Sequence, residues 1–100
     1  MLTSYTLSAV PANLDSVHNY YEQMVLAEIQ RQLAGKTYGS DFVADVACVA
    51  LNHLPPRYIR YDVDMAFYLS PKESMEMEEK VAKAVIAALE FVQRRGSRNV

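Results

Sequence analysis

The stretch DFVADVACVALNHLPPRYIRYDVD, residues 41–64, decides how this chain folds. Apolar side chains cover most of the circumference of residues 42–54, which predicts a largely buried helix whose small residues permit close packing. The helix must stop at Pro55 and Pro56, because proline removes the amide donor and forces the preceding residue out of the helical region. The short aromatic and β-branched run RYIRY, residues 57–61, then predicts an extended segment, which we expect to pair as a two-stranded edge across a dimer.

A long helix is predicted before this stretch. Apolar residues follow helical spacing from Asn13 to Leu33, and Gly35 is placed to end the helix in the left-handed region. The turn-rich connection that follows ends in Ser40 and Asp41, and the side-chain oxygen of either residue can cap the next helix. The sequence therefore predicts two helices joined by a short turn.

One further long helix is predicted after the stretch. Residues 62–69 fit either one or two helical turns or a continued strand, and periodicity over so short a segment does not separate the two. Ser70, Pro71 and Glu73 form a capping-box pattern at the start of a helix. An apolar stripe at helical spacing then continues to Arg95, whose charge complements the carbonyl end of the helix.

Length and composition describe one small helical domain. A chain of 100 residues, 51% of them hydrophobic, can form one core and rarely divides. We expect a mainly α fold, a small bundle of three to four helices with one short extended segment after the Pro-Pro turn. We expect it to be dimeric, because so small a core gains stability from a second subunit. We assign residues 11–95 to this domain, residues 1–10 to a flexible N-terminal arm and residues 96–100 to a frayed C-terminal tail.

Charge and cysteine content exclude several functions. A formal net charge of -2 argues against a polybasic membrane anchor or a general nucleic-acid coat, and no direct DNA binding is expected. One cysteine, Cys48, excludes an intrachain disulfide and a multi-cysteine zinc site, and we expect it to lie buried and inert in the apolar helix. The opening MLTSYTLSAVP has no basic region and no apolar run suited to export or to spanning a membrane, so we expect a cytoplasmic protein.

No pattern in the sequence supplies a catalytic centre, and we expect no enzyme. The chain has no nucleophile elbow, phosphate loop or Gly-rich dinucleotide fingerprint. His18 and His53 have no partner at a metal-ligand spacing, so no bound metal is expected. The pair formed by Asp62 and Asp64 could hold magnesium with a diphosphate, although so short a pattern is also typical of a solvated surface. A metal-dependent phosphodiesterase remains as a third hypothesis.

Residues 52–64 carry the densest set of polar and aromatic side chains, beside the Pro-Pro turn. Guanidinium groups bind phosphates, tyrosine rings stack on bases, and carboxylates accept from the amide and amine edge of guanine. Alternation in an extended chain gives two faces, one with Tyr58, Arg60 and Asp62 and the other with Arg57, Ile59, Tyr61 and Val63. The same composition also fits a structural network, in which the arginines pair with Asp45, Asp62 or Asp64 and the tyrosines pack in the core.

The same region resembles a known family. The core ALNHLPPRY, residues 50–58, is similar to the signature of the late competence development protein ComFB family, as is the surrounding run DVACVALNHLPPRYIRYDVDMAFY, residues 45–68. The run NYYEQMVLAEI, residues 19–29, is similar to the first helix of that family. The resemblance implies a small, mostly helical homodimer without known catalysis. Several relatives are receptors for cyclic di-GMP or cyclic di-AMP, and some carry cysteine clusters that bind zinc, from which this chain departs because it has Cys48 alone.

The resemblance therefore leads to a receptor hypothesis. The chain would be a non-enzymatic cytosolic receptor for a cyclic dinucleotide, with cyclic di-GMP favoured over cyclic di-AMP, and it would signal through an unidentified protein partner without a cofactor. An isologous homodimer would offer the same groups to both halves of the symmetric ligand. The candidate ligand-binding residues are Lys36, Asn52, Arg57, Tyr58, Arg60, Tyr61, Asp62 and Asp64.

Each type of candidate residue has an expected role. The arginines are assigned to phosphates or base stacking, the tyrosines to ring faces, the aspartates to the guanine edge and the lysine to an additional charge from the neighbouring turn. The asparagine is expected either to cap the helix end or to bind a base edge. The alternative function is a protein interaction adaptor in competence, pilus or transcription regulation that binds no nucleotide.

Overall fold

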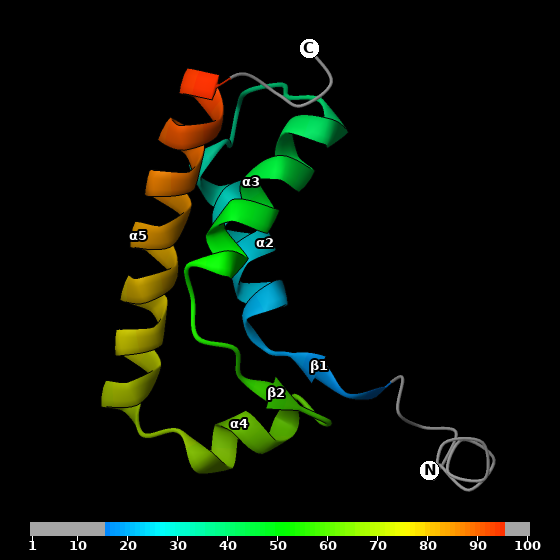
Figure 1. Cartoon of the computed structure of the whole chain (residues 1–100). Helices are drawn as coiled ribbons and strands as arrows, with labels where there is room; N and C mark the ends of the chain where they lie inside the picture. The colour runs from blue at the N-terminus through cyan, green and yellow to red at the C-terminus, as the bar shows by residue number, and fades with distance from the viewer. Residues whose placement is uncertain (1–15, 96–100) are drawn as a thin grey trace, which may run out of the picture.

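The computed structural model describes residues 16–95, which form a mainly helical fold (Figure 1). In chain order, the elements of this part are β1 (His18–Asn19), α2 (Tyr21–Gln32), α3 (Ser40–Asn52), β2 (Tyr58–Ile59), α4 (Val63–Tyr68) and α5 (Pro71–Arg95). The prediction of a mainly α fold with one short extended segment after the Pro-Pro turn is confirmed for these residues. The predictions made for residues 1–10 and 96–100 lie outside the described part of the chain.

Helices α2, α3 and α5 pack around a shared hydrophobic core. Figure 1 shows α5 running along the length of the molecule beside α2 and α3, with β1, β2 and α4 together at one end. The largest fully buried side chains are Val25, Ile29, Val46 and Val85, and they come from all three helices. Burying a side chain of this size contributes about 1.5–3 kcal/mol relative to leaving it exposed. The core therefore holds the three helices together, and it extends to the end where β1, β2 and α4 lie, because Met65 of α4 is buried in it and Ile59 of β2 packs against it.

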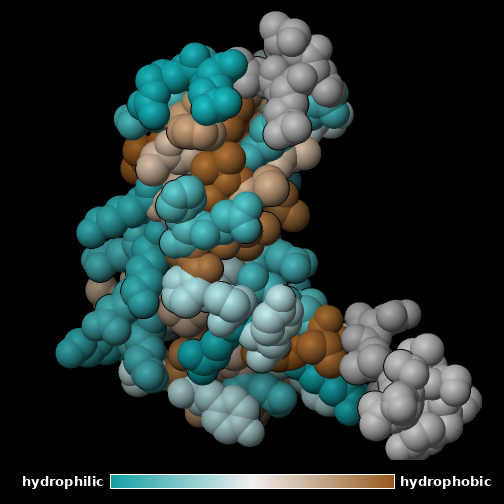
Figure 2. Space-filling model, viewed as in Figure 1, coloured by the Kyte–Doolittle hydropathy of each residue, from teal (hydrophilic) through white to brown (hydrophobic). Residues whose placement is uncertain are grey.

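Helix α5 starts where the sequence predicts and buries the predicted stripe. The Ser70 hydroxyl accepts a hydrogen bond from the Glu73 amide (3.1 Å), and the Glu73 carboxylate accepts one from the Ser70 amide (2.9 Å), which confirms the capping box. The buried residues of the helix are Met77, Val81, Val85, Ala88 and Val92. Figure 2 shows polar side chains along the outer side of α5 and apolar ones where α5 faces α3.

Helix α2 begins later than the sequence predicts. The helical spacing starts at Asn13, which lies outside the described residues, but His18 and Asn19 form strand β1 and the helix starts at Tyr21. The side-chain oxygen of Asn19 accepts a hydrogen bond from the Tyr21 amide (3.2 Å), and short polar side chains of this kind compete with the helix for backbone amides. The end of the helix is as predicted, because Gly35 has a φ of 80°.

Strand β2 pairs within the chain, so the predicted pairing across a dimer is wrong. It runs antiparallel to β1, with Ile59 opposite His18 and Tyr58 opposite Asn19. The strand is also shorter than residues 57–61, so the alternation of side chains predicted beyond Ile59 does not hold. The segment that fitted either a helix or a strand takes the helical alternative and forms α4.

Helix α3 is less buried than predicted. Val46 and Ala50 are buried, whereas most of its other apolar residues are partly buried, because α2 and α5 cover part of its circumference. Cys48 is exposed, so the prediction that this thiol is buried is wrong. The predicted cap by Ser40 or Asp41 is also wrong, because the helix starts at Ser40 itself and the cap position falls on a glycine.

Replacing Ser70 by alanine is expected to lower the free energy of unfolding by about 0.5–2 kcal/mol, because the Glu73 amide loses its acceptor. Urea unfolding followed by circular dichroism measures this change. Ser40→Ala is the matched control, since Ser40 caps no helix, and it is expected to change the stability by less than about 0.5 kcal/mol. Equal effects of the two substitutions would contradict the role of the capping box.

Candidate functional site

The backbone of Arg57 is fixed where the chain leaves the Pro-Pro turn. Its amide donates to the side-chain oxygen of Asn19 (2.9 Å), and its carbonyl accepts from the Tyr20 amide (2.7 Å). Because Pro55 and Pro56 carry no amide hydrogen, Arg57 is the first residue after them that can donate from the backbone. This pair of hydrogen bonds sets the position at which β2 and its polar side chains begin.

The segment that follows presents aromatic and cationic side chains to solvent. Tyr58 is 68% exposed and Tyr61 is 52% exposed. The Arg60 guanidinium lies over the Tyr61 ring, 4.9 Å from its centroid, and Arg60 Nε donates to the Ser16 hydroxyl (3.2 Å). A guanidinium stacked on a ring keeps donors at its edge for an anion or a base. We call Arg57, Tyr58, Arg60 and Tyr61 the ribbon cluster.

Two of the aspartates predicted for a structural ion-pair network do not bind these arginines. Within residues 16–95, neither Arg57 nor Arg60 makes an ion pair with Asp62 or Asp64. The tyrosines of the ribbon cluster lie at the surface and not in the core. The positive charges of the ribbon cluster are therefore not neutralised by these two aspartates.

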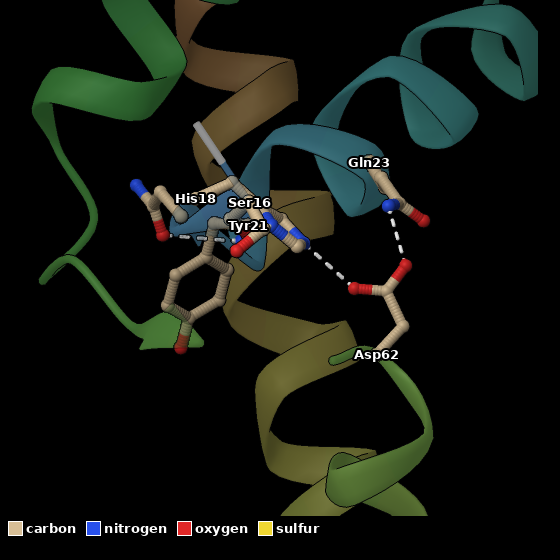
Figure 3. Close-up of polar contacts among 6 residues, drawn as sticks. Ser16, His18, Tyr21, Gln23 and Asp62 are labelled. Carbon is tan, nitrogen blue, oxygen red and sulfur yellow. Dashed lines mark hydrogen bonds and ion pairs between the residues drawn. The ribbon is translucent and has the colours of Figure 1, made fainter. Parts of the chain in front are cut away.

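Asp62 instead binds residues at and after β1 (Figure 3). His18 Nε2 donates to Asp62 Oδ1 (2.7 Å), and Gln23 Nε2 donates to Asp62 Oδ2 (2.7 Å). His18 Nδ1 faces the Ser16 carbonyl (2.9 Å), so both ring nitrogens face acceptors, and the doubly protonated imidazolium satisfies both. The Ser16 carbonyl and the Asp62 carboxylate raise the pKa of His18, and the hydrogen bonds from His18 and Gln23 lower the pKa of Asp62.

The elements from β1 to α5 match one protein family. The family model described as Late competence development protein ComFB matches residues 18–96. The chain belongs to the ComFB family. No curated protein and no solved structure matches it. The Pro-Pro turn and the ribbon cluster both lie inside the part of this ComFB chain that the family model covers.

The remaining candidate residues are spread over the ComFB domain. Lys36 lies in the connection between α2 and α3, which Figure 1 places at the opposite end of the bundle from β2, so one chain does not bring it to the ribbon cluster. Asn52 is the last residue of α3, and its amide donates to Cys48 Sγ (3.7 Å), so it does not cap the helix end as predicted. Asp64 lies in the first turn of α4, shortly after the cluster. The ligand contacts of all these residues stay predictions.

Two further features are absent from residues 16–95. Within that range, no three His, Cys, Asp or Glu side chains are placed to hold a metal ion. No helix in the same range is long and apolar enough to cross a membrane.

The sequence did not predict a cavity that lies beside the ribbon cluster. The cavity has a volume of about 240 Å³ and separates the Pro-Pro turn from the first half of α5. Its polar lining residues are Tyr21, Arg57, Glu73, Glu76 and Lys80. The α5 residues among them follow the pattern of an ordinary solvated helix face, and no spacing in the sequence places them near Arg57.

Asn19→Ala is expected to lower the free energy of unfolding by about 1–2 kcal/mol, because the amides of Tyr21 and Arg57 both lose their acceptor. Urea unfolding gives the value. Asn52→Ala is the matched control, since the Asn52 side chain binds a sulfur atom and no backbone amide. A loss for Asn19→Ala that is no larger than that of the control would show that Asn19 does not hold the two segments together.

The contact between His18 and Asp62 is expected to make stability depend on pH. The pKa of His18 is raised, so its contribution is complete below the ordinary value of 6.5 and is lost as the pH rises through the raised pKa. The pKa of Asp62 is lowered, so its contribution is complete above the ordinary value of 3.8 and is lost as the pH falls through the lowered pKa. The pair therefore stabilises the fold fully between about pH 3.8 and 6.5.

Thermal unfolding across this range, compared between the wild type and Asp62→Asn, tests the expectation. The stability advantage of the wild type should shrink as the pH rises past the raised pKa of His18. His53→Gln is the control, because the His53 ring binds the Val49 carbonyl and no carboxylate. A constant advantage from pH 5 to pH 9, on the order of the range over which histidines titrate, would refute the charged pair.

Proposed function

We propose that this chain is a non-enzymatic receptor for a cyclic dinucleotide, with cyclic di-GMP preferred to cyclic di-AMP. It acts in the cytoplasm as a homodimer and passes the ligand state to a protein partner. Membership of the ComFB family connects the chain to competence development. The resemblance of residues 45–68 to the signature of that family, several members of which are receptors for cyclic dinucleotides, supports the choice of ligand.

The single observation that carries the proposal is the exposed stack of Arg60 on Tyr61, with Tyr58 close in the chain and also exposed. A cyclic dinucleotide presents two phosphates and two base faces. Guanidinium groups bind phosphates through forked hydrogen bonds, and tyrosine rings stack on bases. The ribbon cluster offers both groups within one short segment, and the hydrogen bonds at Arg57 hold that segment in place.

The surface of α4 supports a second copy of this chain as the dimer partner. Val63, Phe67 and Tyr68 are exposed, with Phe67 at 81% and Tyr68 at 72%. Exposed apolar side chains of this size on one short helix are typical of an interaction surface. Because α4 follows the ribbon cluster directly in the chain, a two-fold interface through α4 would bring two ribbon clusters to one symmetric ligand.

The same α4 surface favours the second candidate function, an adaptor that binds a different protein and no nucleotide. The two functions differ in what the purified chain binds. A receptor binds a cyclic dinucleotide without any other protein, whereas an adaptor requires its partner.

Calorimetric titration with cyclic di-GMP, cyclic di-AMP and a linear dinucleotide at near-physiological salt tests the proposal. We expect saturable binding of a cyclic form, at one ligand or half a ligand per chain, and no conversion of the ligand into a linear product. Arg60→Met is expected to weaken binding roughly 10-fold to 100-fold, the loss of one charge-assisted hydrogen bond.

Arg94→Met is the matched control, because Arg94 is exposed in the last turn of α5, away from β2. It should leave the affinity unchanged. A folded sample that binds none of the ligands would contradict the receptor function and favour the adaptor. Conversion of the ligand into product would contradict the non-enzymatic assignment.

A further inference from the structure

The cavity between the Pro-Pro turn and α5 is lined by both apolar and charged side chains. Apolar groups form part of its wall, namely Pro55, Pro56, Leu69 and Met77. Opposite charges come from Arg57 and Lys80 on one hand and from Glu73 and Glu76 on the other. A flat ring with polar edges suits such a lining, since its faces can contact the apolar groups while its edges form hydrogen bonds.

Tyr21 provides an unpartnered polar group at this cavity. The residue is 4% exposed and its ring lines the cavity. Its hydroxyl has no hydrogen-bond partner within residues 16–95, and no fully buried side-chain oxygen there lacks a partner, so the hydroxyl is accessible to solvent. Figure 3 shows the Tyr21 ring directed away from Asp62, so the hydroxyl is not part of that contact. The hydroxyl is therefore free to form a hydrogen bond with a polar group of a ligand in the cavity that Tyr21 lines.

The charged groups of the cavity are available to a ligand. Arg57 and Lys80 form no ion pair within the described part of the chain. Glu73 uses one carboxylate oxygen to accept from the Ser70 amide. Hydrogen bonds from Ser70, and in addition the positive charge of Arg57, hold the pKa of Glu73 below its ordinary value, so Glu73 stays ionised as an acceptor.

The other large cavity lacks these features. It lies between α2 and α5, has a volume of about 390 Å³ and is lined by Met24, Ala27, Glu28, Arg31, Glu78 and Val81. Glu28 and Arg31 bind each other there, so their charges are already paired. The unpartnered Tyr21 hydroxyl and the unpaired arginine occur together at the cavity of Tyr21 and Arg57.

We propose that the cavity of Tyr21 and Arg57 binds a guanine base, an inference that rests on the proposed function and adds a base-specific site to it. The carboxylates of Glu73 and Glu76 accept hydrogen bonds from the N1 and N2 edge of guanine. Arg57 donates to the O6 and N7 edge, the commonest arginine contact with this base. Adenine fits less well, because it lacks the adjacent pair of N–H donors that a carboxylate binds.

A phosphate group is a poorer occupant of this cavity. Two carboxylates in the lining would repel a dianion, even with Arg57 and Lys80 beside them. The volume of about 240 Å³ is also below the usual range of about 300–1,000 Å³ for drug-sized ligands, so it suits one base and not a whole dinucleotide. The phosphates would then lie on the ribbon cluster, which continues directly from Arg57.

The first test is an NMR titration of the full chain with guanosine 5′-monophosphate and, separately, adenosine 5′-monophosphate. The guanine nucleotide at millimolar concentration should shift the amide resonances of Arg57, Leu69 and Met77. The adenine nucleotide should shift them several-fold less at the same concentration. Unchanged resonances of these amides with the guanine nucleotide would overturn the guanine site.

Two substitutions test the named contacts. Glu76→Gln should weaken binding of guanosine 5′-monophosphate roughly tenfold, the cost of losing one good base contact. Tyr21→Phe keeps the buried ring, and it should weaken binding about threefold to tenfold through loss of the hydroxyl alone. Glu79→Gln is the matched control, since Glu79 is exposed on the same helix and does not line the cavity. Wild-type affinity in Glu76→Gln would overturn the assignment.

Cyclic di-GMP calorimetry on the same proteins separates the two proposals. If the wild type binds no cyclic dinucleotide but the guanine nucleotide shifts the lining amides, the receptor function fails and the guanine site stands. If cyclic di-GMP binds equally well to the wild type and to Glu76→Gln, the receptor function stands and the guanine site is overturned.

Discussion

The side-chain oxygen of Asn19 accepts hydrogen bonds from the Tyr21 and Arg57 amides, while the Tyr20 amide donates to the Arg57 carbonyl. These bonds join the start of α2 to the first residue after the Pro-Pro turn. The two prolines have no amide hydrogen and donate no backbone hydrogen bond, so Arg57 is the first residue after them that can donate one to a neighbouring segment. The antiparallel pairing of β1 and β2 continues directly from this connection.

Arg57 consequently belongs to two surfaces at once. Its side chain lines the cavity beside α5, and the exposed stack of Arg60 on Tyr61 follows it in the chain. A ligand with both bases and phosphates needs such a pair of neighbouring surfaces, one that holds a flat ring and one that binds charge. The core of α2, α3 and α5 supports the cavity, and the hydrogen-bonded pair of β1 and β2 supports the exposed stack of Arg60 on Tyr61.

The sequence predicted those parts of the fold that depend on local chemistry. The capping box at Ser70, the apolar stripe of α5 and the left-handed Gly35 are each set by residues close together in the chain, so pattern and structure agree. The start of α2, the partner of β2 and the role of Asp62 could not be predicted, because each depends on a contact with a residue distant in sequence. The cavity was missed for the same reason, although its residue types were ordinary in their own helices.

Hydrogen exchange of the full chain, with and without cyclic di-GMP at saturating concentration, tests most directly the claim that a nucleotide binds on both sides of Arg57. We expect slowed exchange to concentrate in residues 57–61 and in the first half of α5, with little change in the connection between α2 and α3. Slowed exchange confined to that connection, or none at any amide of a folded sample, would contradict it.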